Sequence, residues 1–230
     1  MKVVAIIVAA GRGKRTGHST KKQFLSVGSK PILAYSLDVF DSIDRVDKII
    51  LVIPRGWKRY CQKEIIEKYG YRKKIEVISG GARRQDSVAC GLALVSSDYE
   101  IVIIHDGVRP FVSRKMIVES IAKARKFRAC VVAVPVTDTV KMVNMKGVIE
   151  RTLPREYLWR VQTPQTFRLS LIKKAYAKAL KDKFYGTDDA QLVERMNKPV
   201  KVISGDYRNM KITTREDLIL AETLLSGKPF

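Results

Sequence analysis

Short runs of apolar residues alternate along the chain with longer stretches in which apolar positions recur every third or fourth residue. The short runs are rich in Val and Ile and are mostly apolar, as expected for strands of a parallel sheet buried on both faces. They predict strands at Val3–Val8, Lys48–Ile53, Ile75–Ile78, Ile101–His105, Cys130–Val134 and Val200–Ile203. The longer stretches predict helices at Ile32–Phe40, Trp57–Lys68, Gln85–Leu94, Arg114–Lys126, Leu169–Leu180, Asp188–Arg195 and Arg215–Leu225.

This alternation predicts an α/β fold with a mostly parallel sheet and helices on both of its faces. At 230 residues the chain is long enough for one such domain with a core of ordinary size. No internal repeat or Ser/Gly-rich linker divides it. We therefore expect a single domain over residues 1–230.

One segment, residues 136–165, breaks the alternation. Alternating apolar and polar residues flank Asn144-Met145-Lys146-Gly147, which predicts a β-hairpin with a short loop. The segment is too long for an ordinary connection. We expect a protruding β-arm that gains stability by packing on a second subunit, because an isolated hairpin is marginal in water. A plain surface hairpin is the alternative.

Candidate chemistry begins where the first predicted strand ends. The turn Ala9-Ala10-Gly11-Arg12-Gly13 has small residues that let its backbone approach a ligand, and Lys14, Arg15, Lys21 and Lys22 follow it. Exposed N–H groups in such a turn form a concavity that binds anions. The spacing matches neither the P-loop nor the dinucleotide fingerprint. The turn therefore predicts a polyphosphate site, such as one for a nucleoside triphosphate; a tight turn with solvated cations is the alternative.

Polar motifs also follow later strands. Gly80-Gly81 leads to Asp86-Ser87 after the third strand, and His105-Asp106 leads to Arg109 after the fourth. Ligands of open α/β sheets bind outside the carboxyl ends of the strands, so we expect these motifs to share one rim with the Gly turn. Taken singly, each has an ordinary interpretation. Ser87 suits a helix N-terminus, Asp106 suits a turn, and Thr163-Pro164 and Thr187-Asp188 look like helix starts.

The net charge of +21 favours acidic partners: nucleic acid, a membrane surface or phosphorylated small molecules. The basic residues are dispersed, often beside acids in predicted helices, and aromatic residues are not interleaved with them as in nucleic-acid binders. We therefore expect no nucleic-acid partner and keep a nucleic-acid-binding protein as a distant alternative.

Further features restrict the setting. The three cysteines are far apart and suggest neither a disulfide framework nor a zinc site, which fits the cytoplasm. No signal peptide is visible, and no apolar stretch reaches the roughly 18 residues needed to cross a bilayer, so we expect no membrane partner. With two histidines in the chain, we expect no protein-bound transition metal.

Together, the motifs closely resemble one family, 2-C-methyl-D-erythritol 4-phosphate cytidylyltransferase of isoprenoid biosynthesis. The matching pieces occur in the family's order and span nearly the whole chain. They are Ala9-Ala10-Gly11-x-Gly13-x-Arg15, Lys22-Gln23-Phe24-Leu25, Gly80-Gly81-x-x-Arg84-x-Asp86-Ser87-Val88, His105-Asp106-x-x-Arg109-Pro110, Pro135-Val136-x-Asp138-Thr139-Val140-Lys141, Thr163-Pro164-Gln165-x-Phe167, Thr187-Asp188-Asp189-Ala190 and Lys211-Ile212-Thr213. Ribitol-5-phosphate cytidylyltransferase shares almost all of them and is the alternative.

The resemblance implies a Rossmann-like nucleotidyltransferase domain that transfers CMP from CTP to a polyol phosphate and releases pyrophosphate. Arg15 and Lys22 would be catalytic, at the α-phosphate. Ala10, Gly11, Gly13, Gly81, Asp86 and Ser87 would bind the nucleotide, and Asp106, Arg109, Thr139, Arg155, Thr163 and Lys211 would bind the polyol phosphate. Mg²⁺ would be held mainly by the CTP phosphates. Thr139 and Arg155 lie on the arm, which in the family crosses to the other subunit of a homodimer.

One position departs from the family pattern. The family often carries an acidic residue just before the Asn that corresponds to Asn209, and here that position is Arg208. Asp206 is nearby but displaced. The contacts to the polyol hydroxyls in this region are therefore left open.

Overall fold

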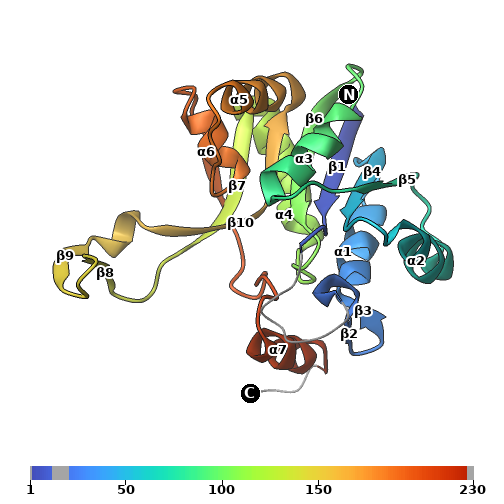
Figure 1. Cartoon of the computed structure of the whole chain (residues 1–230), viewed down its shortest axis with the longest axis horizontal. Coiled ribbons are helices and arrows are strands. Elements are labelled where there is room, and N and C mark those ends of the chain that lie inside the picture. Colours follow the sequence, from blue (N-terminus) through green and yellow to red (C-terminus); the bar gives the residue numbers. More distant parts are fainter. Residues whose placement is uncertain (1, 12–20, 227–230) are drawn as a thin grey trace.

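A central seven-stranded sheet organises the computed structural model, which describes residues 2–11 and 21–226 (Figure 1). The strand order is β11-β7-β10-β6-β1-β4-β5. The strands are β1 (Lys2–Val8), β4 (Lys48–Ile53), β5 (Ile75–Ser79), β6 (Tyr99–Asp106), β7 (Ala129–Pro135), β10 (Trp159–Arg168) and β11 (Lys201–Ser204). All neighbours pair in parallel except β10, which runs antiparallel to both β6 and β7.

Helices cover both faces of this sheet. They are α1 (Ile32–Asp41), α2 (Lys58–Cys61), α3 (Arg84–Ala93), α4 (Arg114–Phe127), α5 (Leu169–Lys181), α6 (Asp189–Glu194) and α7 (Arg215–Ser226); a π-helical segment, Gln62–Glu67, continues α2. Ile7 of β1 belongs to the core shared with α1 and α4, whereas its neighbour Ile6 belongs to the core shared with α3 and α5. Successive side chains of a strand point to opposite faces, so each apolar run serves two cores at once. The predicted α/β class, mostly parallel sheet and two covered faces are confirmed.

The six predicted strands and seven predicted helices are all present, with ends that differ by a few residues at most. Within the central sheet, the strand that the sequence did not indicate is β10; the short pair β2 (Ser26–Val27) and β3 (Lys30–Pro31), outside this sheet, was not indicated either. β10 contains Gln162, Thr163, Gln165 and Thr166, which are buried although they are polar. Their side chains are satisfied by hydrogen bonds rather than by apolar packing, so the hydrophobic pattern gives no signal. Thr163-Pro164, which resembles a helix start in sequence, lies inside this strand.

The arm is shorter than residues 136–165 because its predicted end is part of β10. Its hairpin pairs β8 (Val140–Val143) with β9 (Ile149–Leu153) and projects from the main body (Figure 1). Asn144 shapes the turn as predicted, since its side-chain oxygen accepts from the backbone N–H groups of Lys146 and Val148. Gly147 takes a positive φ of 79°, which glycine adopts at low cost. A short 3₁₀ turn, Arg155–Tyr157, leads back to β10.

Candidate active site

A pocket of about 340 Å³ opens at the carboxyl ends of β1 and β6. From β1 the sheet continues to β4 on one side and to β6 on the other, and such a switch in strand order leaves a crevice for ligands. The pocket is lined by Val8, Ala9, Ala10, Gly11, Lys22, Gln23, Gly81, Ala82, Arg83, Arg84, Ser87, Asp106, Val108, Lys211 and Thr213. The strand-end motifs therefore share one rim, as predicted.

Each residue of Lys22-Gln23-Phe24 has a different task. Lys22 lines the pocket and its Nζ donates to the Ile212 carbonyl at 3.0 Å. Gln23 is buried, and its amide donates to the Ala9 carbonyl at 2.5 Å, which ties the turn after β1 to this segment. Phe24 packs in the core. The two buried residues that follow Lys22 thus fix where its ammonium lies.

The start of α3 forms the next wall. Asp86 accepts from the Arg83 backbone N–H at 3.0 Å, so its carboxylate caps the helix, and it is not among the residues that line the pocket. Ser87 does line the pocket; its hydroxyl accepts from the Gly81 N–H at 3.2 Å and donates to the Arg83 carbonyl at 3.0 Å. A Cβ on Gly80 would lie 2.7 Å from the Ser87 Oγ, so only glycine fits there.

Asp106, at the end of β6, carries the strongest electrostatic interactions of the site. Arg84 Nε lies 2.8 Å from its Oδ1 and Lys211 Nζ lies 2.7 Å from its Oδ2. Burial opposes ionisation of this carboxyl group, but the charges of Arg84, Lys211 and Arg109 outweigh it and hold the pKa of Asp106 well below its usual range. The carboxylate is therefore charged and oriented by two cations.

A buried hydrogen-bond chain supports Asp106 from behind. Thr163 Oγ1 accepts from the Asp106 backbone N–H at 3.1 Å and lies 3.0 Å from His105 Nδ1. His105 Nε2 lies 3.3 Å from the Arg109 carbonyl, which can only accept. His105 is therefore neutral with its proton on Nε2, and Nδ1 accepts from Thr163. Burial lowers the pKa of His105 to about 3, in agreement with this arrangement.

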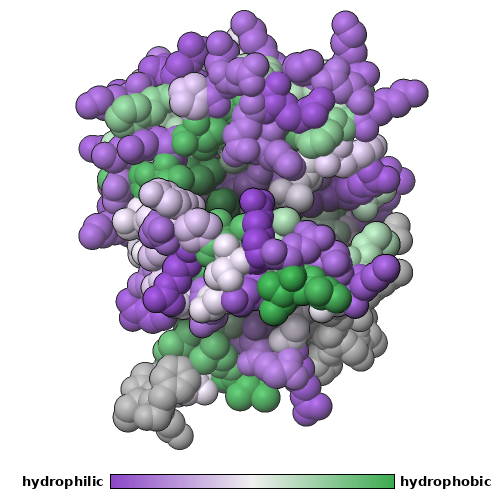
Figure 2. Space-filling model, turned by 90° about the vertical axis from the view of Figure 1, so that its left-hand side faces the viewer, coloured by the Kyte–Doolittle hydropathy of each residue, from purple (hydrophilic) through white to green (hydrophobic). Residues whose placement is uncertain are grey.

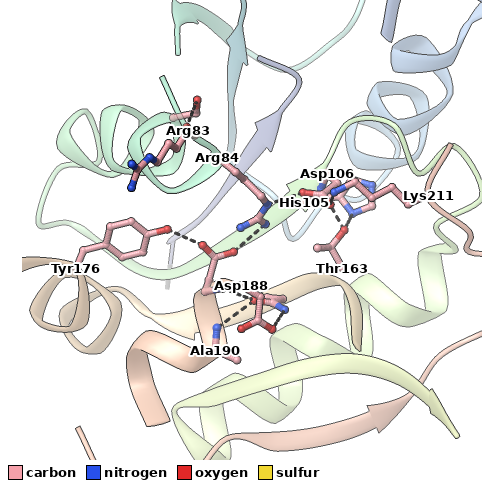
Figure 3. Close-up of polar contacts among 12 residues, drawn as sticks. Arg83, Arg84, His105, Asp106, Thr163, Tyr176, Asp188, Ala190 and Lys211 are labelled. Carbon is pink, nitrogen blue, oxygen red and sulfur yellow. Dashed lines mark hydrogen bonds and ion pairs between the residues drawn. The ribbon is translucent and has the colours of Figure 1, made fainter. Parts of the chain in front are cut away.

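A second pocket of about 330 Å³ adjoins the first and shares Arg84, Asp106 and Lys211 with it. Its other lining residues are Arg109, Val161, Gln162, Thr163, Gln165, Thr187 and Asp188. Figure 3 shows Arg84, Asp106, Thr163 and Lys211 converging from separate elements. Two adjacent pockets that share two cations, Arg84 and Lys211, suit two phosphorylated ligands that react with each other.

Residues 3–227 match the family model for 2-C-methyl-D-erythritol 4-phosphate cytidylyltransferase. The chain belongs to this family. It is a nucleotidyltransferase. It is 47% identical over 225 residues to the 2-C-methyl-D-erythritol 4-phosphate cytidylyltransferase of Caldanaerobacter subterraneus subsp. tengcongensis, covering 98% of this chain and 99% of the relative.

Solved structures agree with this assignment. The 4-diphosphocytidyl-2C-methyl-D-erythritol synthase of Anaerococcus prevotii superposes with a TM-score of 0.88 at 37% identity, covering 98% of this chain and 96% of that one. The 2-C-methyl-D-erythritol 4-phosphate cytidylyltransferase of Thermus thermophilus gives a TM-score of 0.81 at 33% identity, covering 98% of this chain and 100% of that one.

The structure brings most of the cytidylyltransferase residues named from the sequence to these two pockets. They are Ala10, Gly11, Lys22, Gly81, Ser87, Asp106, Arg109, Thr163 and Lys211. Gly13 and Arg15 lie outside the described residues. Thr139 and Arg155 lie on the exposed arm and line neither pocket, and Arg155 donates to the Thr137 carbonyl at 2.9 Å.

Two residues beside the pockets were assigned no role from the sequence. Arg84 lies between Asp106 and Asp189, and Asn209 is buried where its amide donates to Gln162 Oε1 and the Thr163 carbonyl. A usable signal existed for Arg84, because it follows Gly80-Gly81 at a strand end. The sequence left open whether Asp206 contacts the polyol hydroxyls. Its carboxylate pairs with Arg208, and Asp206 lines neither pocket.

Proposed function

We propose that this cytidylyltransferase transfers CMP from CTP to 2-C-methyl-D-erythritol 4-phosphate, giving 4-diphosphocytidyl-2-C-methyl-D-erythritol and pyrophosphate. The observation that carries the proposal is the pair of adjacent pockets that share Arg84, Asp106 and Lys211. CTP would occupy the first pocket and the polyol phosphate the second. Their reacting phosphates would then meet beside the shared cations.

The chemistry needs positioning and charge stabilisation. A phosphate oxygen of the polyol phosphate attacks the α-phosphorus of CTP; the new O–Pα bond forms as the Pα–O bond to the β-phosphate breaks, and pyrophosphate leaves. The nucleophile is already an anion, so no strong base is required. Lys22, held by Gln23 and the core, would neutralise charge that develops at the α-phosphate. Arg15 is assigned the same role by resemblance.

The nucleotide would be held largely by backbone groups and by small side chains. Ala10 and Gly11 follow β1 and line the first pocket, so their N–H groups are available to the triphosphate there. Gly81 and Ser87 would face the cytidine. Asp86 would act indirectly, because its capping bond to Arg83 shapes the start of α3.

The polyol phosphate would lie among Asp106, Arg109, Thr163 and Lys211. The Asp106 carboxylate is suited to accept from polyol hydroxyl groups, and Arg109 and Lys211 to bind the phosphate. Arg109 Nη1 donates to the Asn209 carbonyl at 2.7 Å, which fixes its direction.

Mg²⁺ would bind mainly through the CTP phosphates. Within residues 2–11 and 21–226 no group of three or more His, Cys, Asp or Glu side chains could hold a metal ion. Asp106, the carboxylate that lines both pockets, already forms ion pairs with Arg84 and Lys211. When bound, the ion would neutralise phosphate charge, and phosphate oxygens with water would supply its ligands.

We further propose a homodimer in which the arm completes the partner's site. The arm and its base expose many large apolar side chains: Met142, Val143, Met145, Val148, Ile149, Tyr157, Trp159 and Val161. Figure 2 looks onto the side from which the arm projects, and apolar residues are visible there among hydrophilic ones. Such a surface is expected to be covered by protein. A partner would also explain why Thr139 and Arg155 lie away from the pockets of their own chain.

Location and other partners remain predictions. Among the described residues no helix is both long and apolar enough to cross a membrane. Cys61, Cys90 and Cys130 are free thiols, which fits the proposed cytoplasmic location. We propose neither a nucleic-acid nor a membrane partner.

A pyrophosphate-release assay tests the proposed reaction. CTP, UTP, ATP and GTP are each combined with 2-C-methyl-D-erythritol 4-phosphate and with ribitol 5-phosphate. We expect kcat/KM with CTP to exceed that with either purine nucleotide by at least about 10²-fold, since a site that pairs with cytosine leaves polar groups unpaired with a purine. Equal turnover of ATP would contradict the nucleotide assignment, and preference for ribitol 5-phosphate would contradict the polyol assignment.

A further inference from the structure

A buried ladder of alternating donors and acceptors, formed by Tyr176, Asp189 and Arg84, leads from α5 to Asp106. The Tyr176 hydroxyl of α5 donates to Asp189 Oδ1 at 2.5 Å, and Asp189 Oδ2 lies 2.9 Å from Arg84 Nη2. Arg84 then reaches Asp106 through its Nε. In Figure 3 Tyr176 lies at one end and Lys211 at the other, with Arg84 and Asp106 between them. Tyr176 and Asp189 line neither of the two substrate pockets.

We propose that Tyr176 and Asp189 are positioning residues of the transferase reaction: they lock the Arg84 guanidinium so that Asp106 is presented correctly to the polyol phosphate. This inference rests on the function proposed above, in which Asp106 contacts that substrate. It assigns a role in the reaction to two residues that would not touch either substrate.

The geometry of Arg84 explains why a second carboxylate is needed. An arginine side chain loses considerable rotamer freedom when it is ordered, and a single bond through Nε leaves the rest of the guanidinium group free to tilt. Asp189 Oδ2 forms an ion pair with the same guanidinium at a second nitrogen, Nη2. With carboxylates bound at two different nitrogens, the tilt of the guanidinium is restricted, and so is the direction from which Asp106 Oδ1 is bound.

Asp189 is itself anchored to the central sheet. Gln165 of β10 accepts through Oε1 from the N–H groups of Asp189 and Ala190, at 3.0 and 3.2 Å. Its amide donates to Asp188 Oδ2 at 2.8 Å. Gln165 is 1% exposed and pairs in register with Ile104 of β6, two residues before Asp106. The two carboxylates that flank Arg84 are therefore attached to adjacent strands, Asp189 through Gln165 to β10 and Asp106 directly to β6.

Tyr176 completes the ladder as an obligate donor. Burial, with Asp189 beside it, raises the pKa of Tyr176 far above its usual value, so its hydroxyl keeps its proton. Asp189, which is 1% exposed, thus has one oxygen committed to Tyr176 and the other to Arg84. Buried ion pairs often add little net stability to a fold. A gain in stability therefore does not by itself account for the Asp189–Arg84 pair beside a substrate pocket.

The experiment uses steady-state kinetics of the full-length enzyme with CTP and 2-C-methyl-D-erythritol 4-phosphate each varied in turn. Asp189→Asn keeps the shape and removes the charge; Tyr176→Phe removes only the hydroxyl. Asp41→Asn and Tyr71→Phe are matched controls, because Asp41 is a buried carboxylate beside Arg72 and the Tyr71 hydroxyl bonds to the Ala34 carbonyl, all away from both pockets. Tm is measured for every variant.

We expect Asp189→Asn to lower kcat/KM for the polyol phosphate by about 10- to 100-fold, since displacements of about 1 Å can cost that much. KM for CTP should stay within about threefold. Tyr176→Phe should act in the same direction by about 3- to 10-fold. The double variant should be little worse than Asp189→Asn, because the two residues act through one ladder. The controls should leave the kinetics of both substrates unchanged whatever they do to Tm.

A rise in KM for CTP as large as the change seen for the polyol phosphate would overturn the positioning role. So would additive effects in the double variant, or control variants whose kcat/KM for the polyol phosphate falls in proportion to Tm. If Asp189→Asn fails to fold, Tyr176→Phe decides alone through its KM pattern. Wild-type activity separates the two proposals: an active wild type with variants that behave like the controls overturns only the ladder. A wild type with no turnover of this substrate pair overturns both.

Discussion

His105 should make the stability of this enzyme depend on pH in a range where few other groups titrate. Its ring is fully buried at the end of β6 between Thr163 and the Arg109 carbonyl. Burial lowers its pKa from 6.5 to about 3. The unfolded chain therefore takes up a proton below pH 6.5 that the folded chain refuses until about pH 3. The contribution of the buried neutral His105 ring to the free energy of unfolding is therefore present above pH 6.5 and is lost as the pH falls towards 3.

The magnitude follows from these two pKa values. Between pH 7.5 and 5.5 the differential protonation of one such histidine lowers the free energy of unfolding by about 1.4 kcal/mol. For a domain of this size that corresponds to a fall in Tm of about 3–5 °C. Most carboxyl groups are ionised throughout this interval, so they add little to the change.

Urea unfolding at closely spaced pH values from 7.5 to 5.5 is the assay. His105→Asn removes the titrating ring and keeps an acceptor for the Thr163 hydroxyl, so the variant should be less stable but nearly independent of pH. The other histidine of the chain is His18, and His18→Gln is the control for its titration. A wild type with flat stability over this interval would refute the reasoning, as would an unchanged slope in His105→Asn or a slope lost in His18→Gln.

Three further predictions concern catalysis, packing and assembly. Lys22→Ala should lower kcat by about 10²–10³-fold with a smaller effect on CTP binding. Its control, Lys58→Ala, removes an exposed cation from α2 and should have no effect. Near-normal turnover of Lys22→Ala in the pyrophosphate assay would contradict the catalytic role of Lys22. Gly80→Ala should lower the free energy of unfolding by about 1–3 kcal/mol, because its Cβ would lie 2.4 Å from the Ala10 Cβ. Gly11→Ala should unfold like the wild type in urea, because among the described residues other than its chain neighbours no atom lies within 4 Å of its Cβ; equal stability of the two variants would contradict the packing argument. Mixing Lys22→Ala with Arg155→Ala subunits should restore about half of one dimer's activity in the heterodimer, because one of its two shared sites then carries neither defect; no recovery after verified subunit exchange, or a monomer by light scattering, would argue against shared sites.

The sequence by itself determined the elements whose signal is local. In the run Lys48–Ile53 every residue after Lys48 is apolar because both faces of the sheet are covered, and this burial is visible without any knowledge of the neighbours. The hairpin turn at Asn144 and Gly147 was predictable for the same reason, since its hydrogen bonds and its positive φ involve adjacent residues. The rim position of Asp106 and Gly81 followed from the rule that ligands bind at strand ends.

Only the tertiary structure decided how β10 and the ladder are placed. β10 is polar in sequence and buried in the fold, because Gln162, Thr163 and Gln165 find partners on β6, α6 and the segment around Asn209. Such partners are distant in sequence and leave no periodic trace. Arg84 shows the same limit: its cationic side chain would suit a solvated helix surface equally well until Asp106 and Asp189 are brought to either side of it. The burial of an apolar segment can be recognised from its own residues. The role of a polar side chain depends on its hydrogen-bond and ion-pair partners, which are distant in sequence and are brought to it only by the fold.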